Sequence, residues 1–200
     1  LAPEVVNVIR LRNQSSDRQR AARKWVQALD TVDWLTAQLP TGSRYQIILF
    51  NTEAQFALPE TQGRWLEVAN SDQVERVITS VRETLPSGGT SLYNAFEFLN
   101  ELDSEPDNIF IITDGLPTQG RDTPRKNTVS GPARLKHYRD AVDKLPDNVP
   151  VNVVLSPMEG DPMAASEFWK LAQNTGGSFM APAEDLSLIH ISEPTRPQAI

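Results

Sequence analysis

Cysteine is absent from this chain of 200 residues, and histidine occurs only twice. The lack of cysteine excludes disulfide scaffolds, cysteine–zinc sites, iron–sulfur clusters and thiol catalysis. Any catalytic triad or zinc site that needs an imidazole must therefore use His137 or His190.

Basic residues and long hydrophobic runs are also in short supply. The 19 Lys and Arg residues are outnumbered by 26 Asp and Glu residues, which gives a formal net charge of −7. Because nucleic acid and anionic membrane surfaces are bound by clustered cations, we expect neither as a partner. No apolar run approaches the length of a membrane-spanning helix, so we also expect no direct membrane insertion.

Sequence signatures of several enzyme classes are missing as well. The chain contains no Gly-x-Ser-x-Gly elbow, no P-loop lysine and no Gly-x-Gly-x-x-Gly turn. These absences disfavour, in turn, a serine hydrolase, a P-loop phosphotransferase and a dinucleotide-dependent enzyme.

What the sequence does contain is an alternation of helical and strand-like patterns in a length typical of one domain. The expected helices are residues 17–39, 72–85, 92–102, 135–145 and 161–176, and the expected strands are residues 45–51, 53–58, 108–113, 149–155 and 178–181. Most of these strands are continuous apolar runs, which are typical of strands buried on both faces of a parallel sheet. We therefore predict an α/β fold, a doubly wound, Rossmann-like, mostly parallel sheet with helices on both faces.

Two of the predicted helix starts carry recognisable caps. Asp72 and Glu75 have the spacing of a capping box, and Asp161 precedes Pro162, a residue suited to the first position of a helix. Residues 3–13 fit either a helix or a strand, and we favour a helix.

Polar residues gather where two predicted strands end. Asn51 ends one strand and Asp114 follows another, while Thr90 and Ser91 begin the helix between them. Since ligands of open α/β sheets bind at the carboxyl ends of the strands, these side chains can share one small space. Oxygen ligands of this kind suit a hard cation such as Mg²⁺, and Gly89 would permit a close approach of the backbone to a ligand.

The same residues have plainer interpretations. Asp114 and Gly115 can form a simple turn, and Thr90 or Ser91 can serve as a helix N-cap. From spacing alone we favour these plainer roles.

The loop of residues 115–132 is long for a compact domain and carries Arg121, Arg125 and Lys126. Its cations could steer an acidic ligand toward the site, or they could be solvated without further role, which we favour. His137 is expected to be exposed, and we assign it no role.

The order of the segments YQIILFN, SGGTSLYNAF, NIFIITDG and VPVNVVLS resembles the von Willebrand factor type A (vWA) domain over about residues 17–181. The resemblance implies a metal-ion-dependent adhesion site built from three loops, with Thr90 matching the second loop and Asp114 the third. It implies Mg²⁺ or Mn²⁺ as the cofactor and a protein partner whose acidic side chain fills the open coordination position. Further candidate ligand-binding residues are Ser91, Gly89, Gly115 and Arg121.

The first loop of that site, Asp-x-Ser-x-Ser, occurs nowhere in the sequence. In the family this loop leads directly into a helix, and we interpret residues 1–14 as the beginning of that helical region. We therefore expect the central first strand and its loop to precede Leu1, and we expect this N-terminally truncated fragment to bind Mg²⁺ weakly or not at all.

Three functions remain in competition. The leading hypothesis is a protein-binding module in which Mg²⁺ bridges to an acidic residue of a partner, with the site incomplete in this fragment. The alternative is a degenerate, metal-free vWA domain that serves as an assembly or scaffold unit. Least favoured is a hydrolase or phosphotransferase that uses Asp114 as base or nucleophile.

We assign residues 1–185 to one vWA-like domain and residues 186–200 to a non-native tail. The segment LIHISEPTRPQAI has no periodicity continuous with the fold, and it resembles translated sequencing-adapter read-through. The family resemblance further suggests a bacterial, membrane-tethered parent with this domain outside the cytoplasm.

Overall fold

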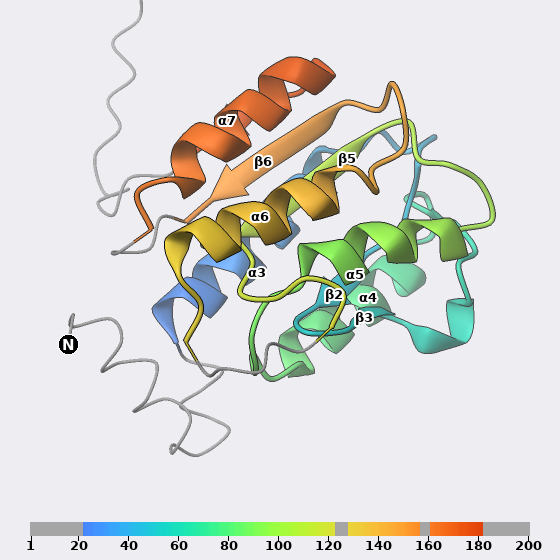
Figure 1. Cartoon of the computed structure of the whole chain (residues 1–200). Coiled ribbons are helices and arrows are strands. Elements are labelled where there is room, and N and C mark those ends of the chain that lie inside the picture. Colours follow the sequence, from blue (N-terminus) through green and yellow to red (C-terminus); the bar gives the residue numbers. More distant parts are fainter. Residues whose placement is uncertain (1–21, 123–127, 157–160, 182–200) are drawn as a thin grey trace, which may run out of the picture.

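The computed structural model describes residues 22–122, 128–156 and 161–181, and its helices and strands alternate along the chain (Figure 1). The helices are α3 (Arg23–Gln38), α4 (Ser71–Glu83), α5 (Leu92–Glu97), α6 (Gly131–Val142) and α7 (Ala164–Thr175), with short 3-10 turns η1 (Pro59–Thr61) and η2 (Phe98–Glu101). The strands are β1 (Arg44–Tyr45), β2 (Ile48–Phe50), β3 (Ala54–Phe56), β4 (Leu66–Glu67), β5 (Ile109–Thr113), β6 (Val151–Leu155) and β7 (Phe179–Met180). The expectations for residues 3–13 and 186–200, and for Arg125 and Lys126, fall outside the described residues.

Parallel pairing organises the main sheet. Strands β5, β6 and β7 lie side by side in that order, with Ile111 opposite Val153 and Val153 opposite Phe179. Strands β2 and β3 lie within the two strands predicted at 45–51 and 53–58 and pair as an antiparallel hairpin, and β1 pairs with β4, a strand that the sequence analysis missed. No helix in the described part of the chain has the length and apolar character needed to cross a bilayer.

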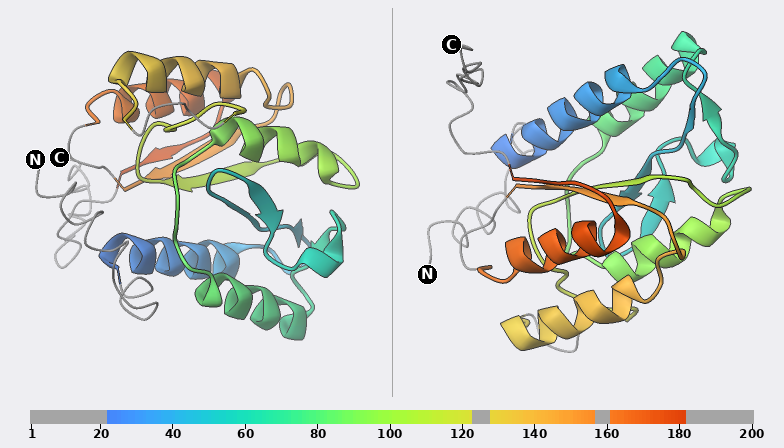
Figure 2. Two further views of the ribbon diagram at one scale, coloured as in Figure 1. Left: turned by 60° about the horizontal axis from the view of Figure 1, so that its bottom comes forward. Right: turned by 90° about the horizontal axis from the view of Figure 1, so that it is seen from above.

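Helices cover both faces of this strand layer. Figure 2 shows α3 and α4 on one face and α5, α6 and α7 on the other. On the second face, Phe168 of α7 and Ala141 of α6 are fully buried in one apolar cluster with β5 and β6. A smaller cluster joins Val77 of α4 to Tyr45 and Leu66. The predicted class, a parallel sheet flanked by helices, is confirmed.

A single polar side chain interrupts the apolar run of β6. Asn152 is only 9% exposed, and its amide nitrogen donates to the side-chain oxygen of Asn108 at 2.6 Å and to the carbonyl of Ile109 at 3.3 Å. Its amide oxygen accepts from the backbone N–H of Ser178 at 3.0 Å. The side chain therefore connects the segments that begin all three strands of the sheet.

The helix caps predicted at Asp72 and Asp161 were wrong. Helix α4 is capped by Asn70, whose side chain accepts from the N–H of Gln73 at 3.1 Å, rather than by Asp72. Helix α7 begins at Ala164, and Asp161 is not its cap, because the Asp161 carboxylate is engaged elsewhere. The helix predicted at 92–102 is a short α-helix that tightens into η2.

Two of the strands predicted as apolar runs buried on both faces, β2 and β5, are open on one edge. Every residue of β2 is only partly buried, and Phe110, in the middle of β5, is 43% exposed. Among the described residues no strand lies between β2 and β5, which belong to separate sheets. The apolar sequence of a strand cannot reveal whether a neighbour is present, but the vWA resemblance led us to expect no central first strand in this chain, and its absence would leave two such edges open.

We predict that hydrogen exchange will alternate along β5. The Ile109 N–H and the Thr113 carbonyl are bonded toward β6, so in a parallel ladder the N–H groups of Phe110 and Ile112 point to the opposite edge. These two amides should exchange at least about tenfold faster than that of Ile111 in an NMR exchange experiment on this chain. Equal protection of the Phe110, Ile111 and Ile112 amides would show that another segment pairs with this edge.

Candidate functional site

Three loops at the carboxyl ends of the strands form one hydrogen-bonded unit. The loop after β2 meets the loop before α5, because the N–H of Ser91 donates to the carbonyl of Asn51 at 2.6 Å. The loop after β5 joins them, since the N–H groups of Thr118 and Gln119 donate to the Thr90 carbonyl at 2.9 and 3.1 Å. In return the Thr90 N–H donates to the Thr118 hydroxyl at 2.8 Å.

The side-chain amides of Asn94 and Gln119 add further hydrogen bonds to the same unit. The carbonyl of Thr52 accepts from Asn94 Nδ2 at 2.8 Å and from Gln119 Nε2 at 3.2 Å. Asn94 Nδ2 also donates to the carbonyl of Arg121 at 3.3 Å, and Gln119 is only 4% exposed. The first part of the 115–132 loop is therefore packed structure, while Arg121 itself is exposed.

Ser91 is committed to the fold. Its hydroxyl accepts from the N–H of Asn94 at 3.1 Å and donates to the carbonyl of Gly120 at 2.7 Å. The residue is fully buried and is the N-cap of α5. Of the two interpretations that the sequence left open for Ser91, the structure supports the cap.

Thr90 and Asp114 differ from Ser91 in their surroundings. Both are partly buried, and no described residue forms a hydrogen bond with the Thr90 hydroxyl. The Asp114 side chain is 47% exposed, and its Oδ2 lies 3.7 Å from Nζ of Lys24 at the start of α3. The two side chains therefore keep oxygens available at one rim, beside a lysine that the sequence analysis did not anticipate.

A buried ion pair holds the backbone just beyond Asp114. Asp161 Oδ2 accepts from the N–H of Leu116 at 2.7 Å and lies 2.7 Å from Arg134 Nη2. Arg134 also donates two hydrogen bonds to the Leu116 carbonyl, from Nε at 3.2 Å and from Nη2. No sequence signal linked these distant residues to the site.

The candidate glycines are explained by contacts within the protein. A Cβ on Gly89 would lie 2.5 Å from the Thr118 hydroxyl, and one on Gly115 would lie 2.6 Å from Asp161 Oδ2. A Cβ on Gly120 would lie 3.0 Å from Nδ1 of His137. The sequence analysis expected His137 to be exposed, but it is half-buried. Close packing of loops, without any ligand, is enough to require glycine at positions 89 and 115.

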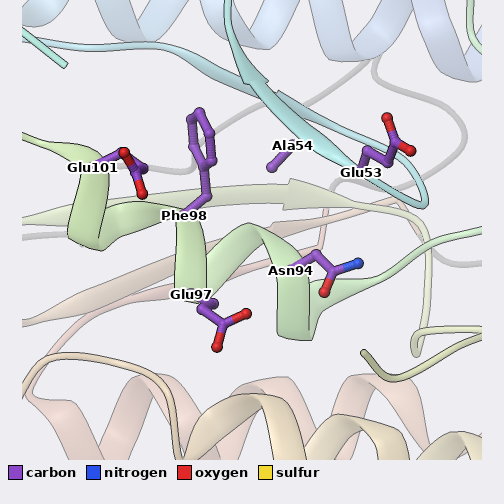
Figure 3. A pocket seen from close by; sticks show the side chains of 6 residues that line it. All are labelled: Glu53, Ala54, Asn94, Glu97, Phe98 and Glu101. Atoms are coloured by element: carbon purple, nitrogen blue, oxygen red, sulfur yellow. The ribbon is translucent and has the colours of Figure 1, made fainter. Parts of the chain in front are cut away.

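No group of three or more Asp, Glu or His side chains in the described part of the chain is placed to hold a metal. The most evident cavity, of about 270 Å³, lies against α5 and η2 and is lined by Glu53, Ala54, Asn94, Glu97, Phe98 and Glu101. Figure 3 shows its three glutamates spread around the opening rather than converging on one point. Neither Thr90 nor Asp114 lines it.

Shifts in pKa occur away from these loops. Burial raises the pKa of Tyr45. Burial, with a smaller contribution from the charge of Glu167, raises the pKa of Tyr138, whose hydroxyl donates to the Glu167 carbonyl at 2.9 Å. Both effects belong to the apolar clusters and not to the rim.

Comparison with known proteins bears on the fold. No family model matches the chain, and no curated protein matches it significantly. Among solved structures, the chain is similar to a von Willebrand factor type A protein from Catenulispora acidiphila, with a TM-score of 0.60, 15% identity and 81% of this chain covered. The chain has the von Willebrand factor type A fold. It spans only 35% of the length of that protein.

Within the vWA fold, hydrogen bonds join the loop of Thr90 and Ser91 to Asn51 and to Thr118 and Gln119, which follow Asp114 in the next loop. The structure gives Ser91, Gly89 and Gly115 roles in packing the loops. Lys24, Thr118, Arg134 and Asp161 were missed, and only Thr118 carried a signal, its closeness in sequence to Asp114.

We expect Gly115→Ala to destabilise the fold by about 1–3 kcal/mol, because the new methyl group would press on the buried Asp161 carboxylate. Gly131→Ala is the matched control, since a Cβ there meets nothing within 4 Å. Chemical denaturation of both variants measures the difference. Equal stability of the two variants would contradict this account of Gly115.

Proposed function

We propose that this chain is part of a metal-dependent protein-interaction module. Thr90 and Asp114 would hold Mg²⁺ or Mn²⁺ together with oxygens from a segment outside the described residues. The observation that carries the proposal is the pair of oxygen-bearing side chains, both partly exposed, on loops that are hydrogen-bonded to each other.

The chemistry of these donors fits the ion but does not complete its shell. A threonine hydroxyl and a carboxylate are hard oxygen ligands, which Mg²⁺ prefers, and Mg²⁺ readily keeps several waters. Asp114 supplies only one negative charge, and Mg²⁺ loses its waters reluctantly. Additional fixed oxygens are needed for firm binding, and a loop of the Asp-x-Ser-x-Ser type would supply them.

The proposed partner is another protein that presents an acidic side chain. A cation with an open coordination position attracts a carboxylate, and Arg121 adds a positive charge on an exposed stretch of the adjoining loop. Across the whole chain acidic residues outnumber basic ones, which disfavours a broad charge-driven contact with an acidic surface. Recognition would therefore depend on one bridging carboxylate.

A metal-free scaffold is the second candidate, and Lys24 is the observation that favours it. Its ammonium group lies 3.7 Å from Asp114 Oδ2 and supplies a positive charge where the ion would contribute its own. Both side chains are substantially exposed, so this pair is worth little energetically. The two candidates are separated by the effect of Lys24→Met, which should strengthen metal binding if Lys24 and the metal compete for Asp114.

An enzyme is the least favoured function. The sequence lacks the Gly-x-Ser-x-Gly, P-loop and Gly-x-Gly-x-x-Gly signatures of common enzyme classes, and the described ion pair of Asp114 is an exposed one with Lys24. The described contact of His137 is with Gly120.

We expect Mn²⁺ to bind this chain weakly, with a dissociation constant of about millimolar or higher. In an NMR titration the backbone signals of Thr90 and of residues 114–116 should broaden first, and the effect should disappear in Asp114→Ala. Asp107→Ala is the control, because Asp107 is exposed at the opposite end of β5.

Two outcomes would contradict this proposal. One is uniform broadening that Asp114→Ala does not change, which would indicate nonspecific binding. The other is tight binding of Mg²⁺ by calorimetry that persists in Asp114→Ala, which would place the metal elsewhere.

A further inference from the structure

We infer that Arg134 and Asp161 are positioning residues that fix the shape of the Asp114 loop before any ligand binds. The inference deepens the proposed function and rests on it for its purpose, but the contacts that carry it are independent of metal. They join three parts of the chain: the loop after β5, helix α6 and the segment that leads into α7.

Both members of the ion pair form hydrogen bonds with the backbone of Leu116. Asp161 accepts from the N–H of Leu116, and Arg134 donates twice to the carbonyl of the same residue. Because both polar groups of Leu116 are bound by the two members of one ion pair, the orientation of its backbone is fixed. Leu116 itself is 2% exposed, so water does not compete for these groups.

Burial makes this arrangement costly unless every bond is made. The Arg134 and Asp161 side chains are 12% and 5% exposed. A buried pair of charges contributes little net stability by itself, whereas a buried charge left without its partner is strongly unfavourable. The pair therefore acts mainly as a constraint on the geometry of whatever it contacts.

The constraint reaches Asp114 because that residue lies between two anchors. On the strand side, the Thr113 carbonyl accepts from the N–H of Ser156 at 2.9 Å. On the loop side, Leu116 is held by the ion pair, and Gly115 leaves the room that the Asp161 carboxylate needs. Only two residues separate the anchors, which leaves the backbone of Asp114 few alternative conformations.

A carboxylate that is already oriented loses less conformational freedom when it binds a cation. The pair therefore acts through Asp114 and does not touch the ligand. Thr90 is placed differently, through the backbone bonds to Thr118 and Gln119, so loss of the ion pair should disturb Asp114 and leave Thr90 in place.

The test compares Asp161→Asn with Lys136→Met in the metal-free chain. Lys136 forms an exposed ion pair with Asp140 on the same helix α6, so its variant removes a charge pair without touching the loop. In Asp161→Asn the Leu116 amide should exchange about tenfold faster relative to that of Val153, which is fully buried in β6. The ¹⁵N order parameters of residues 114 and 115 should fall from about 0.85 toward 0.6, while that of Thr90 stays constant.

Arg134→Lys is the second variant, in case Asp161→Asn does not fold. It keeps the charge but lacks the planar fork that contacts Leu116 and Asp161 together, so the same changes should appear with smaller size. An unchanged ratio of Leu116 to Val153 exchange, or order parameters at 114–115 that match the Lys136→Met control, would overturn the inference. Failure of the proposed function has a different signature, because it shows as Mn²⁺ broadening that Asp114→Ala does not change, while these metal-free readouts still hold.

Discussion

The rim of this molecule is governed by the need to satisfy backbone polar groups that are buried without a regular ladder. Parallel strands end there, and the loops that follow them run through partly or fully buried space. Each buried N–H and carbonyl group must find a partner. The partners are largely side chains: Ser91, Asn94, Thr118, Gln119, Arg134 and Asp161. Thr90 and Asp114 stand out because their side chains are not consumed in this way.

Most polar side chains in these loops therefore hold the loops together, although their residue types are also those of a ligand site. Serine, threonine, asparagine and glycine in a strand-to-helix loop suit a ligand site, and they also suit a closely packed turn. At Ser91 and Gly89 the contacts favour the second explanation. Only the contacts of each atom could separate the two, and those depend on residues far away in the sequence.

The sequence predicted most of the fold because local signals and burial agreed in most segments. The apolar runs of β5 and β6, the β2–β3 hairpin and the helices after them follow from periodicity and turn residues. It failed where a distant contact decided the outcome. Asp161 has every local feature of a helix cap, yet its carboxylate binds Leu116, 45 residues away. Asn70 and Asp72 are both good caps, and the side chain of Asn70 is the one that reaches an N–H.

The open edges of β2 and β5 were expected from the vWA resemblance, with its missing central strand, and not from the apolar patterns of the strands themselves. An alternating or apolar pattern reports how a side chain meets the layers above and below a sheet, but it does not report hydrogen bonding within the sheet. The exposed ring of Phe110 becomes visible only once the neighbours of β5 are known. A sequence pattern likewise does not show which loops lie next to each other, and this limits any inference about a site that needs oxygens from several loops.

The buried amide of Asn152 has a consequence for how the chain finds its sheet. Apolar strands can slide past one another with little loss, since one valine resembles another. If β6 slipped against β5 or β7, this amide would be stranded among hydrocarbon without its three partners, at a cost of several hydrogen bonds. The side-chain amide of Asn152 thus favours the native register of the three strands and makes shifted registers unfavourable.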